Sequence, residues 1–330
     1  MKPIDFLVCV RSYTYNHAPY IEDAMNGFSM QQTNFPFVCV IVDDASTDGE
    51  PEVIMNYLNC HFDLDNETIV RKKETDDFYM SFAQHKTNVN CFFAVYLLKY
   101  NHHILNKDKF QYFSEFHDHV KYNALCEGDD HWIDSMKLQT QVSFLETHPE
   151  YSMCFHNAIK LYVKDNSICS FNAFIQDGDL SAHDAIHHWY VPTASIVCRR
   201  EYRYNPEGLV QIYSGDYSLI LRCLNGGKIY GYAKHMSVYR INFSGTSASA
   251  RIMGKYGFVE EQHKILLESY NKWSNFVFND EVLQRIAYLN KEIKFQHQWK
   301  NKSIGVLFNS LFYSKSLRHV ILYLNRHLPI

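Results

Sequence analysis

The sequence lacks several of the motifs by which common enzyme classes are recognised. It contains no G-x-x-x-x-G-K-[ST] and no G-x-G-x-x-G, the glycine-rich loops that cradle phosphates. It also contains no G-x-S-x-G, the turn that carries the nucleophile of many serine hydrolases. These absences count against a P-loop NTPase, a dinucleotide-binding dehydrogenase and a serine hydrolase.

Long apolar runs and paired cysteines are also missing. No stretch reaches the roughly 20 apolar residues that cross a bilayer. Residues Met1–Asp5 run directly into a strand-like segment, so we expect no signal peptide. The nine cysteines are scattered without a C-x-x-C, and several lie inside apolar runs, as buried thiols do. These features predict a cytoplasmic protein.

Positive charge is scarce in most of the chain. The net charge is −4, so we expect no nucleic-acid partner. Residues 291–330 hold seven Lys/Arg and one Glu, a net +6, which leaves 25 Lys/Arg and 35 Asp/Glu, or −10, in residues 1–290. Two interpretations of this basic, aromatic tail stay open. Its helices pack on the rest of the protein, or they contact the inner face of the plasma membrane as a peripheral anchor.

Strand-like and helix-like segments alternate through residues 1–245, and the chain becomes helix-like afterwards. This pattern predicts an α/β fold with a mostly parallel sheet flanked by helices, residues 1–245, and a helical C-terminal extension, residues 246–330. We expect strands at 6–10, 37–42, 68–70, 122–126, 151–162 and 194–198, and helices at 16–31, 51–58, 82–100 and after Asp134, which we expect to cap its helix.

Two acidic segments follow buried strands, where ligands of parallel sheets bind. Asp43 and Asp44 end the second strand, and carboxylates there accept bonds from ribose hydroxyls or base N–H groups. Alternatively, they only cap the next helix.

Glu127, Asp129 and Asp130 crowd three carboxylates into four residues. A divalent cation such as Mg²⁺ or Mn²⁺ would relieve their repulsion, and Gly128 would let the backbone approach a ligand closely. A solvated acidic turn is the alternative.

Two further polar features carry less specific signals. Asp216 precedes a helical segment, where it acts as a general base or only as an N-cap. His102 and His103 are interpreted as a surface pair rather than as metal ligands.

Residues 4–245 resemble the family 2 glycosyltransferases with the GT-A fold, especially the bacterial members that make surface polysaccharides. The segments that carry this resemblance are Val8–Glu22, Val40–Gly49 and Tyr122–Asn157, with the run Cys126-Glu127-Gly128-Asp129-Asp130-His131-Trp132-Ile133-Asp134 the most specific. The resemblance implies an inverting transfer of a sugar from a nucleotide diphosphate, UDP in many members, to a glycan or lipid-linked acceptor hydroxyl.

By this resemblance, the nucleotide site comprises Ser12, Tyr13, Asp43, Asp44 and Asp129. Asp44 would contact the base, and Ser12 and Tyr13 would flank it.

The metal motif matches Asp129 and Asp130, with Asp130 as the Mn²⁺ or Mg²⁺ ligand. Glu127 stands where many members have the first Asp of that motif. Asp216 matches the catalytic base. Thr193 belongs to a segment that resembles the acceptor side, and Trp132 and Arg240 belong to other matched segments at the site.

The chain departs from the family at three points. Gly215 replaces the acidic residue that often precedes the base, and Asn242 ends a segment that often ends in His. The Gln-x-x-Arg-Trp motif of processive members is absent, which favours transfer of a single sugar. Two other functions stay open: a metal-dependent nucleotidyltransferase, which usually carries a basic, glycine-rich loop near its N-terminus, and a non-catalytic nucleotide-sugar-binding protein.

Overall fold

The computed structural model describes residues 4–172, 176–212, 214–242 and 257–300. The chain forms two compact units, residues 1–205 with 219–242, and residues 206–218 with 243–330. The boundary predicted at residue 245 lies outside the described residues, as does the tail 301–330.

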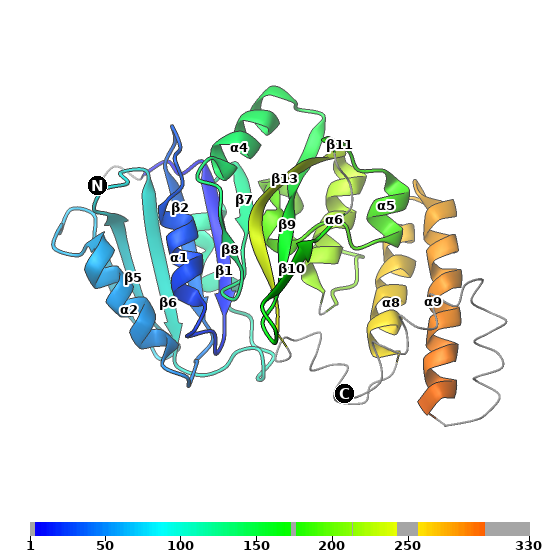
Figure 1. Ribbon diagram of the computed structural model, residues 1–330, viewed down its shortest axis with the longest axis horizontal. Helices are drawn as coiled ribbons and strands as arrows, with labels where there is room; N and C mark the ends of the chain where they lie inside the picture. Colours follow the sequence, from blue (N-terminus) through cyan, green and yellow to red (C-terminus); the bar gives the residue numbers. More distant parts are fainter. Residues whose placement is uncertain (1–3, 173–175, 213, 243–256, 301–330) are drawn as a thin grey trace. The chain divides into compact units, whose positions relative to one another are not determined.

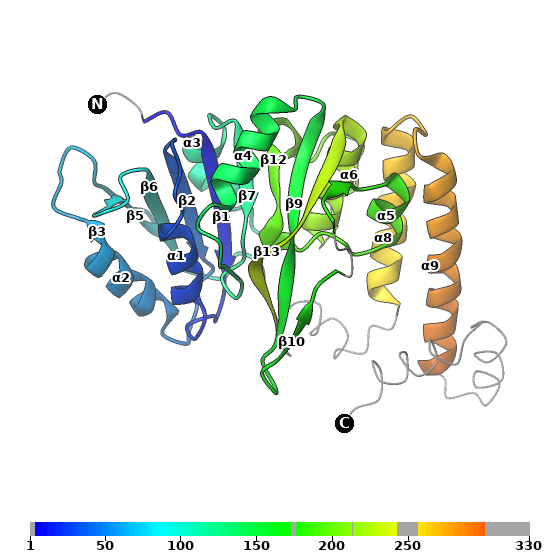
Figure 2. The ribbon, with the colours of Figure 1, turned by 45° about the horizontal axis from the view of Figure 1, so that its top comes forward.

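A single sheet forms the framework of the first unit. Its strands are β1 (Val8–Thr14), β2 (Phe37–Asp43), β3 (Phe62–Asp63), β4 (Arg71–Glu74), β5 (Phe78–His85), β6 (Cys91–Leu98), β7 (Tyr122–Leu125), β8 (His131–Trp132), β9 (Tyr151–Tyr162), β10 (Ser167–Ser170), β11 (Gly178–Asp179), β12 (Val197–Arg199) and β13 (Lys228–Ile241). The strand order is β11-β13-β9-β12-β7-β1-β2-β6-β5-β3. The central strands β7, β1, β2 and β6 are parallel, as are β9 and β13, which Figure 2 shows side by side.

Helices cover both faces of this sheet. They are α1 (Ile21–Ser29), α2 (Glu50–His61), α3 (Ser114–His117), α4 (Lys137–Thr147), α5 (Ala182–His187) and α6 (Gly215–Gly226), with the 3-10 turns η1 (Phe110–Phe113), η2 (Thr193–Ser195) and η3 (Arg200–Tyr202). Figure 1 shows α1, α2 and α4 across one face, where their apolar residues form one core with β1 and β2. The other face packs against η1 and α3. The predicted α/β class is confirmed.

The described part of the second unit contains two long helices, α8 (Phe258–Trp273) and α9 (Asn279–Lys300). They pack against each other along their lengths, and Leu266, Leu267, Tyr270, Val282 and Leu289 are buried. The predicted helical C-terminal region is therefore present within residues 257–300.

Two predicted elements are wrong. Residues 82–100 form no helix but the strands β5 and β6, joined by a turn in which His85 Nδ1 accepts bonds from the N–H groups of Thr87 and Asn88. A short apolar run such as Cys91–Leu98 has the same composition in a buried strand as in a buried helix, and only pairing with β2 decides. Residues 68–70 form a turn that precedes β4.

Several boundaries also differ. The strand expected at 6–10 is Val8–Thr14, and the helix expected at 16–31 begins only at Ile21 and ends at Ser29. Met136, not Asp134, occupies the N-cap of α4, and Asp134 Oδ1 instead accepts the N–H of Met136 at 2.8 Å. The predicted strand at 194–198 is divided between η2 and β12.

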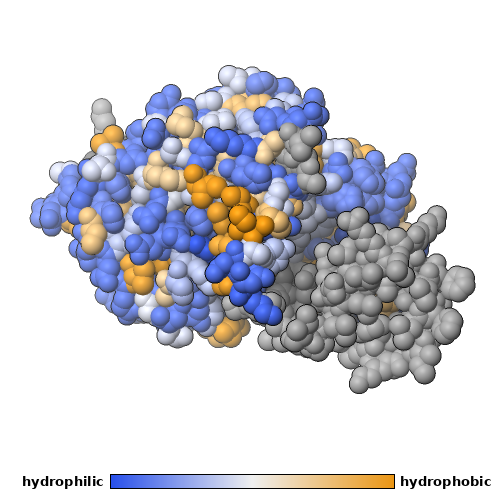
Figure 3. Space-filling model, viewed as in Figure 1, coloured by the Kyte–Doolittle hydropathy of each residue, from blue (hydrophilic) through white to orange (hydrophobic). Residues whose placement is uncertain are grey.

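The face seen in Figure 3 is mainly hydrophilic, with hydrophobic residues gathered near its middle. Among residues 4–300, leaving out the undescribed gaps, no helix has both the length and the apolar character that crossing a bilayer requires. The nine cysteines are free, and seven of them are buried.

Candidate functional site

Three neighbouring parallel strands, β2, β1 and β7, end at one edge of the sheet. The acidic residues that follow β2 and β7 are attached to the end of β1 between them: the N–H of Asp44 donates to Thr14 O at 3.0 Å, and the N–H of Gly128 donates to Tyr13 O at 2.9 Å. The structure thus brings the two predicted acidic segments to the same edge, on either side of β1.

Asp43 is buried with an unfilled acceptor. Its Oδ2 accepts the N–H of Ser46 at 3.2 Å, whereas Oδ1 is enclosed and has no hydrogen-bond partner among the residues that the structure describes. Burial raises the pKa of this carboxyl to about 6. A buried acceptor without a partner costs about 1–3 kcal/mol, which a donor from a ligand would recover.

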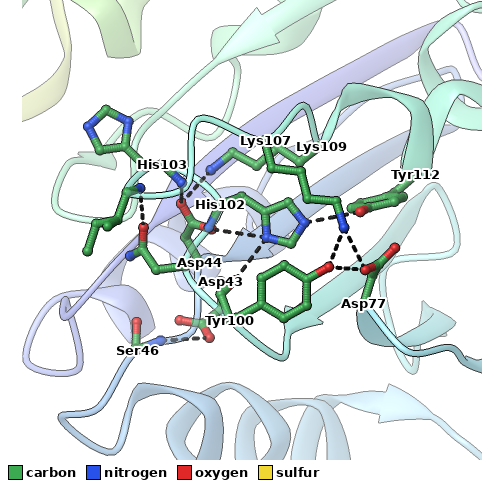
Figure 4. A network of polar contacts seen from close by, with 12 residues as sticks. Asp43, Asp44, Ser46, Asp77, Tyr100, His102, His103, Lys107, Lys109 and Tyr112 are labelled. Atoms are coloured by element: carbon green, nitrogen blue, oxygen red, sulfur yellow. Dashed lines mark hydrogen bonds and ion pairs between the residues drawn. The ribbon is translucent and has the colours of Figure 1, made fainter.

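Asp44 fastens a loop of its own protein (Figure 4). Its Oδ1 accepts the N–H of His102 at 2.8 Å, and its Oδ2 accepts the N–H of His103 at 3.1 Å and Lys109 Nζ at 2.8 Å. His102 is not the surface residue that we expected, because it is fully buried and stacks on Tyr100 with ring centroids 4.7 Å apart. These three donors use much of the capacity of the Asp44 carboxylate.

A buried glutamate that the sequence analysis missed connects the strand ends. Glu50, the first residue of α2, accepts hydrogen bonds from Thr14 Oγ1, from the N–H of His17 at 2.9 Å and from Ser46 Oγ at 2.8 Å. The imidazole of His17 is held through Nδ1, 3.1 Å from Thr14 Oγ1. His17 comes shortly after the end of β1, as Asp44 comes after the end of β2, and this position is the one signal in the sequence that pointed to it.

Asp130 is buried and Asp129 is partly exposed. Asp130 Oδ1 accepts the N–H of Arg240 at 2.8 Å. Burial, followed by the nearby carboxylates Asp129 and Glu127, raises the pKa of Asp130 well above its usual range. Oδ2 of Asp129 lies 3.4 Å from Asn242 Nδ2, so Asn242 contacts this segment although it is not the histidine common in the family.

Arg240 holds the acidic segment in place. Besides its backbone bond to Asp130, its guanidinium donates to Asp129 O at 2.9 Å, pairs with Asp23 and lies 4.9 Å from the centre of the Tyr20 ring. The side chain therefore binds the backbone of the segment and a surface carboxylate of α1.

Gly128 allows a close contact with β1. A Cβ at this position would collide with Oγ1 and Cβ of Thr14. The absence of a side chain therefore lets the acidic segment approach β1, and its contact with a ligand stays a prediction.

The acidic segment supplies only some of the ligands that a divalent cation needs. Within the described ranges, no three His, Cys, Asp or Glu side chains are arranged to hold a metal ion. Asp129 and Asp130 supply hard oxygen atoms, and a cation would relieve the repulsion that raises the pKa of Asp130. Mg²⁺ and Mn²⁺ are commonly held by one or two carboxylates, with water and substrate phosphates completing their coordination. The donor set therefore fits such an ion together with a phosphate ligand.

Ser12 and Tyr13 point to opposite faces of β1, because successive side chains of a strand alternate. Ser12 is fully buried, and its Oγ has no partner. Tyr13 packs edge-on against Phe110 and Phe113, and burial raises its pKa to about 12. A ligand that lies on one face of the sheet therefore cannot contact both of these side chains on that face.

Trp132 belongs to the core and not to an acceptor surface. Its side chain is 1% exposed, donates from Nε1 to Ala194 O at 2.8 Å, and packs against Phe28 with ring centroids 5.0 Å apart. Thr193 lies in η2 next to that carbonyl and is half-buried.

Asp216 lies in the other compact unit, within residues 206–218. Helix α6 begins at Gly215, so Asp216 belongs to the first turn and is not the residue that precedes the helix, as the capping interpretation required. Its Oδ1 accepts the N–H of Tyr217 at 2.8 Å. Its role as a base stays a prediction.

Comparison with known sequences gives relatives without an assigned activity. No family model matches the chain. Uncharacterized proteins of Mycobacterium tuberculosis and Mycobacterium bovis are 31% identical over 241 residues, 72% of this chain. The match covers 60% of each relative, so the chain spans about that share of their length.

Comparison with solved structures identifies the fold. TarS of Staphylococcus aureus, solved in complex with UDP, is 16% identical, with a TM-score of 0.44 over 82% of this chain and 72% of that chain. A mannosyltransferase of Pyrobaculum calidifontis, solved with GDP-Man and Mn²⁺, is 15% identical, with a TM-score of 0.55 over 98% of this chain and 83% of that chain. The second likeness shows that the chain has a glycosyltransferase fold.

Proposed function

We propose that this protein is a glycosyltransferase that uses a nucleotide-sugar donor. The observation that carries the proposal is the pair of acidic segments on either side of the end of β1: Asp43 offers a buried, unfilled acceptor, and Asp129 and Asp130 offer crowded carboxylates. A nucleoside bound at the first and a diphosphate bound at the second would satisfy both. The shared fold supports this assignment.

In this proposal, Asp43 Oδ1 accepts a hydrogen bond from the nucleoside, because no described residue of the protein donates to that oxygen. Asp44 also belongs to the nucleotide site, where it holds the loop of His102 and Lys109 in place and contacts the base. UDP is the nucleotide that the family resemblance favours.

Asp129 and Asp130 would hold Mn²⁺ or Mg²⁺. When bound, such an ion would neutralise negative charge that develops on the departing diphosphate. Arg240 fixes the segment through the backbone of Asp129 and through Asp130 Oδ1, so the carboxylates are oriented before substrate arrives.

The transfer itself is proposed from the resemblance. Asp216 takes a proton from an acceptor hydroxyl, which attacks the anomeric carbon as the nucleoside diphosphate leaves, so that the configuration inverts. The acceptor is a glycan or a lipid-linked hydroxyl. Contact of residues 301–330 with the inner face of the plasma membrane belongs to the same proposal, and unchanged liposome binding after their deletion would eliminate it.

Hydrolysis of UDP- and GDP-sugars, with and without Mn²⁺, tests the function. A glycosyltransferase releases the nucleoside diphosphate, a nucleotidyltransferase releases the monophosphate and a sugar phosphate, and a binding protein releases neither. We expect diphosphate release that requires Mn²⁺ and falls at least 100-fold in Asp130→Asn. Asp76→Asn, which changes an exposed carboxylate, is the matched control. Monophosphate release, or no turnover of any donor, contradicts the proposal.

A further inference from the structure

Cations and aromatic rings alternate along the face of the sheet that packs against η1. Lys109 Nζ lies 4.9 Å from the centre of the Tyr13 ring, and the Arg11 guanidinium lies 5.2 Å from it on β1. Arg11 is also 5.3 Å from the centre of Phe110, which Arg203 approaches to 5.2 Å. Three positive charges are thus gathered around two rings, next to the end of β1.

Arg203 is buried with few partners. Its side chain is 4% exposed, and within the described ranges neither Nη1 nor Nη2 has a hydrogen-bond acceptor. The nearest carboxylate oxygen, Asp118 Oδ1, is 3.9 Å from Nη1 and already accepts bonds from His117 and Tyr204.

Ring contacts offset this burial only partly. A cation over an aromatic ring contributes about 0.5–2 kcal/mol, whereas burying an ion costs several kcal/mol. The guanidinium of Arg203, with one long ion pair to Asp118 and no hydrogen bond from Nη1 or Nη2 to the described residues, can therefore still bind an anion.

Among the described residues, Arg11 also lacks an acceptor for its guanidinium. The residue is half-buried, and its guanidinium forms neither a hydrogen bond nor an ion pair with any side chain or carbonyl that the structure describes. Burial, followed by repulsion from Arg11, lowers the pKa of Arg203. The third cation of the cluster is compensated, because Lys109 pairs with Asp44. Arg11 and Arg203 therefore have the weaker charge compensation in this cluster, as far as the described residues go.

The strand that carries Arg11 lies next to the strand that leads into the acidic segment. Arg11 pairs with Leu125 in the parallel ladder of β1 and β7, and its carbonyl oxygen accepts the N–H of Cys126 at 3.1 Å. Glu127 follows at the next position of the chain. An anion between the two guanidinium groups would therefore lie beside the site at which we place the substrates.

We propose that Arg11 and Arg203 bind a phosphate group of a substrate. Guanidinium groups donate paired N–H bonds that match phosphate oxygens, and partial burial strengthens each bond. The identity of the phosphate rests on the proposed function: it belongs to the donor diphosphate or to a phosphate carried by the acceptor. Phosphate binding itself does not depend on turnover.

Calorimetric titration with inorganic phosphate tests the site in the full-length protein. We expect Arg11→Gln and Arg203→Gln each to raise the Kd for phosphate at least tenfold. The control is Arg71→Gln, because Arg71 also lies over phenylalanine rings, 4.4 Å from Phe82 and 5.1 Å from Phe116, but is paired with Glu115 at 2.6 Å. Arg11 is half-buried, so its variant stays informative if Arg203→Gln does not fold. Equal phosphate affinity in wild type and Arg11→Gln overturns the proposal.

A second titration, with UDP or GDP in the presence of Mn²⁺, identifies the source of the phosphate. A tenfold weaker nucleotide affinity in Arg11→Gln assigns the site to the donor, and an unchanged affinity together with lost phosphate binding assigns it to the acceptor. If no donor is hydrolysed but phosphate binding still depends on Arg11, the proposed function fails while the anion site stands. If donors are hydrolysed and Arg11→Gln changes neither phosphate nor nucleotide binding, the anion site fails alone.

Discussion

Nε2 of His17 lies 3.9 Å from Oδ2 of Asp129, so the residue that follows β1 meets the acidic segment that follows β7. The backbone of His17 is bonded to Glu50, and its other ring nitrogen is held by Thr14. The imidazole is therefore fixed on the protein side and presents Nε2 toward the place at which we expect a diphosphate and its cation.

Replacing His17 tests this placement. We expect His17→Ala to weaken binding of UDP or GDP with Mn²⁺ about tenfold, about 1.4 kcal/mol, because a fixed donor beside the diphosphate is lost. Calorimetry measures the affinity, and His119→Ala, which removes an exposed imidazole, is the control. If both variants bind the nucleotide equally well, His17 has no part in the site.

Glu50 should matter for stability more than its single charge suggests. Glu50→Gln keeps the shape but replaces one acceptor oxygen by a donor, so that at least one of the three donors from Thr14, His17 and Ser46 loses its buried acceptor. We expect a loss of about 1–3 kcal/mol in the free energy of unfolding, measured with urea. Glu52→Gln, an exposed position of the same helix, should change it by less than about 0.5 kcal/mol. Similar losses in the two variants would contradict this account.

The raised pKa of Asp43 predicts that nucleotide binding depends on pH. Its pKa is raised to about 6 by burial, so the ionised form that accepts two bonds predominates only above that pH. We expect nucleotide affinity to rise about tenfold from pH 5 to pH 7, and to stay low and independent of pH in Asp43→Asn.

The same shift affects folding with a definite sign. Between about pH 4 and pH 6 the folded carboxyl retains a proton that the unfolded chain has lost. This contribution to stability is therefore present at low pH and is lost as the pH rises through 6. Relative to wild type, Asp43→Asn should gain stability over that window, and a constant difference in urea unfolding from pH 4 to 7 would refute the shift.

Lys137 titrates in the opposite sense. Lys137 is fully buried, and its Nζ lies 4.1 Å from the centre of the Trp132 ring without a hydrogen-bond partner in the described part of the chain. Burial lowers its pKa to about 7. Between pH 7 and about pH 10 the unfolded chain keeps a proton that the folded lysine has released, so stability from this group rises with pH.

The variant Lys137→Met isolates this effect. We expect it to be at least as stable as wild type at pH 6, because an uncompensated buried charge is replaced by an apolar chain of similar length. Its advantage should shrink as the pH is raised to 9 in urea unfolding. Lys72→Met, at an exposed lysine of β4, should show no such trend, and a parallel trend in both variants would show that Lys137 is not the cause.

Short apolar runs followed by polar residues correctly predicted several buried strands of the sheet. The run Phe37–Val42 followed by Asp43 is a buried strand with a polar end in any α/β protein, and the acidic run after Leu125 has the same form. The segment 82–100 failed because its apolar residues fit a helix and a strand equally well. The prediction for Trp132 was wrong because the three residues before it, Asp129 to His131, are polar, while its own side chain is buried in the core.

The sequence by itself determined that an α/β sheet would carry acidic residues at the ends of two interior strands, since hydrophobic period and turn chemistry are properties of short segments. Only the tertiary structure decided which residues those acidic side chains contact: Asp44 binds the loop of His102, and Asp130 binds the backbone of Arg240. It also brought the two cations Arg11 and Arg203 close together. The two members of each of these three pairs are between 58 and 192 positions apart in the chain, so no short segment of the sequence contains both. Burial and charge compensation depend on such contacts, and they set which carboxylate retains a proton and which cation lacks an anion.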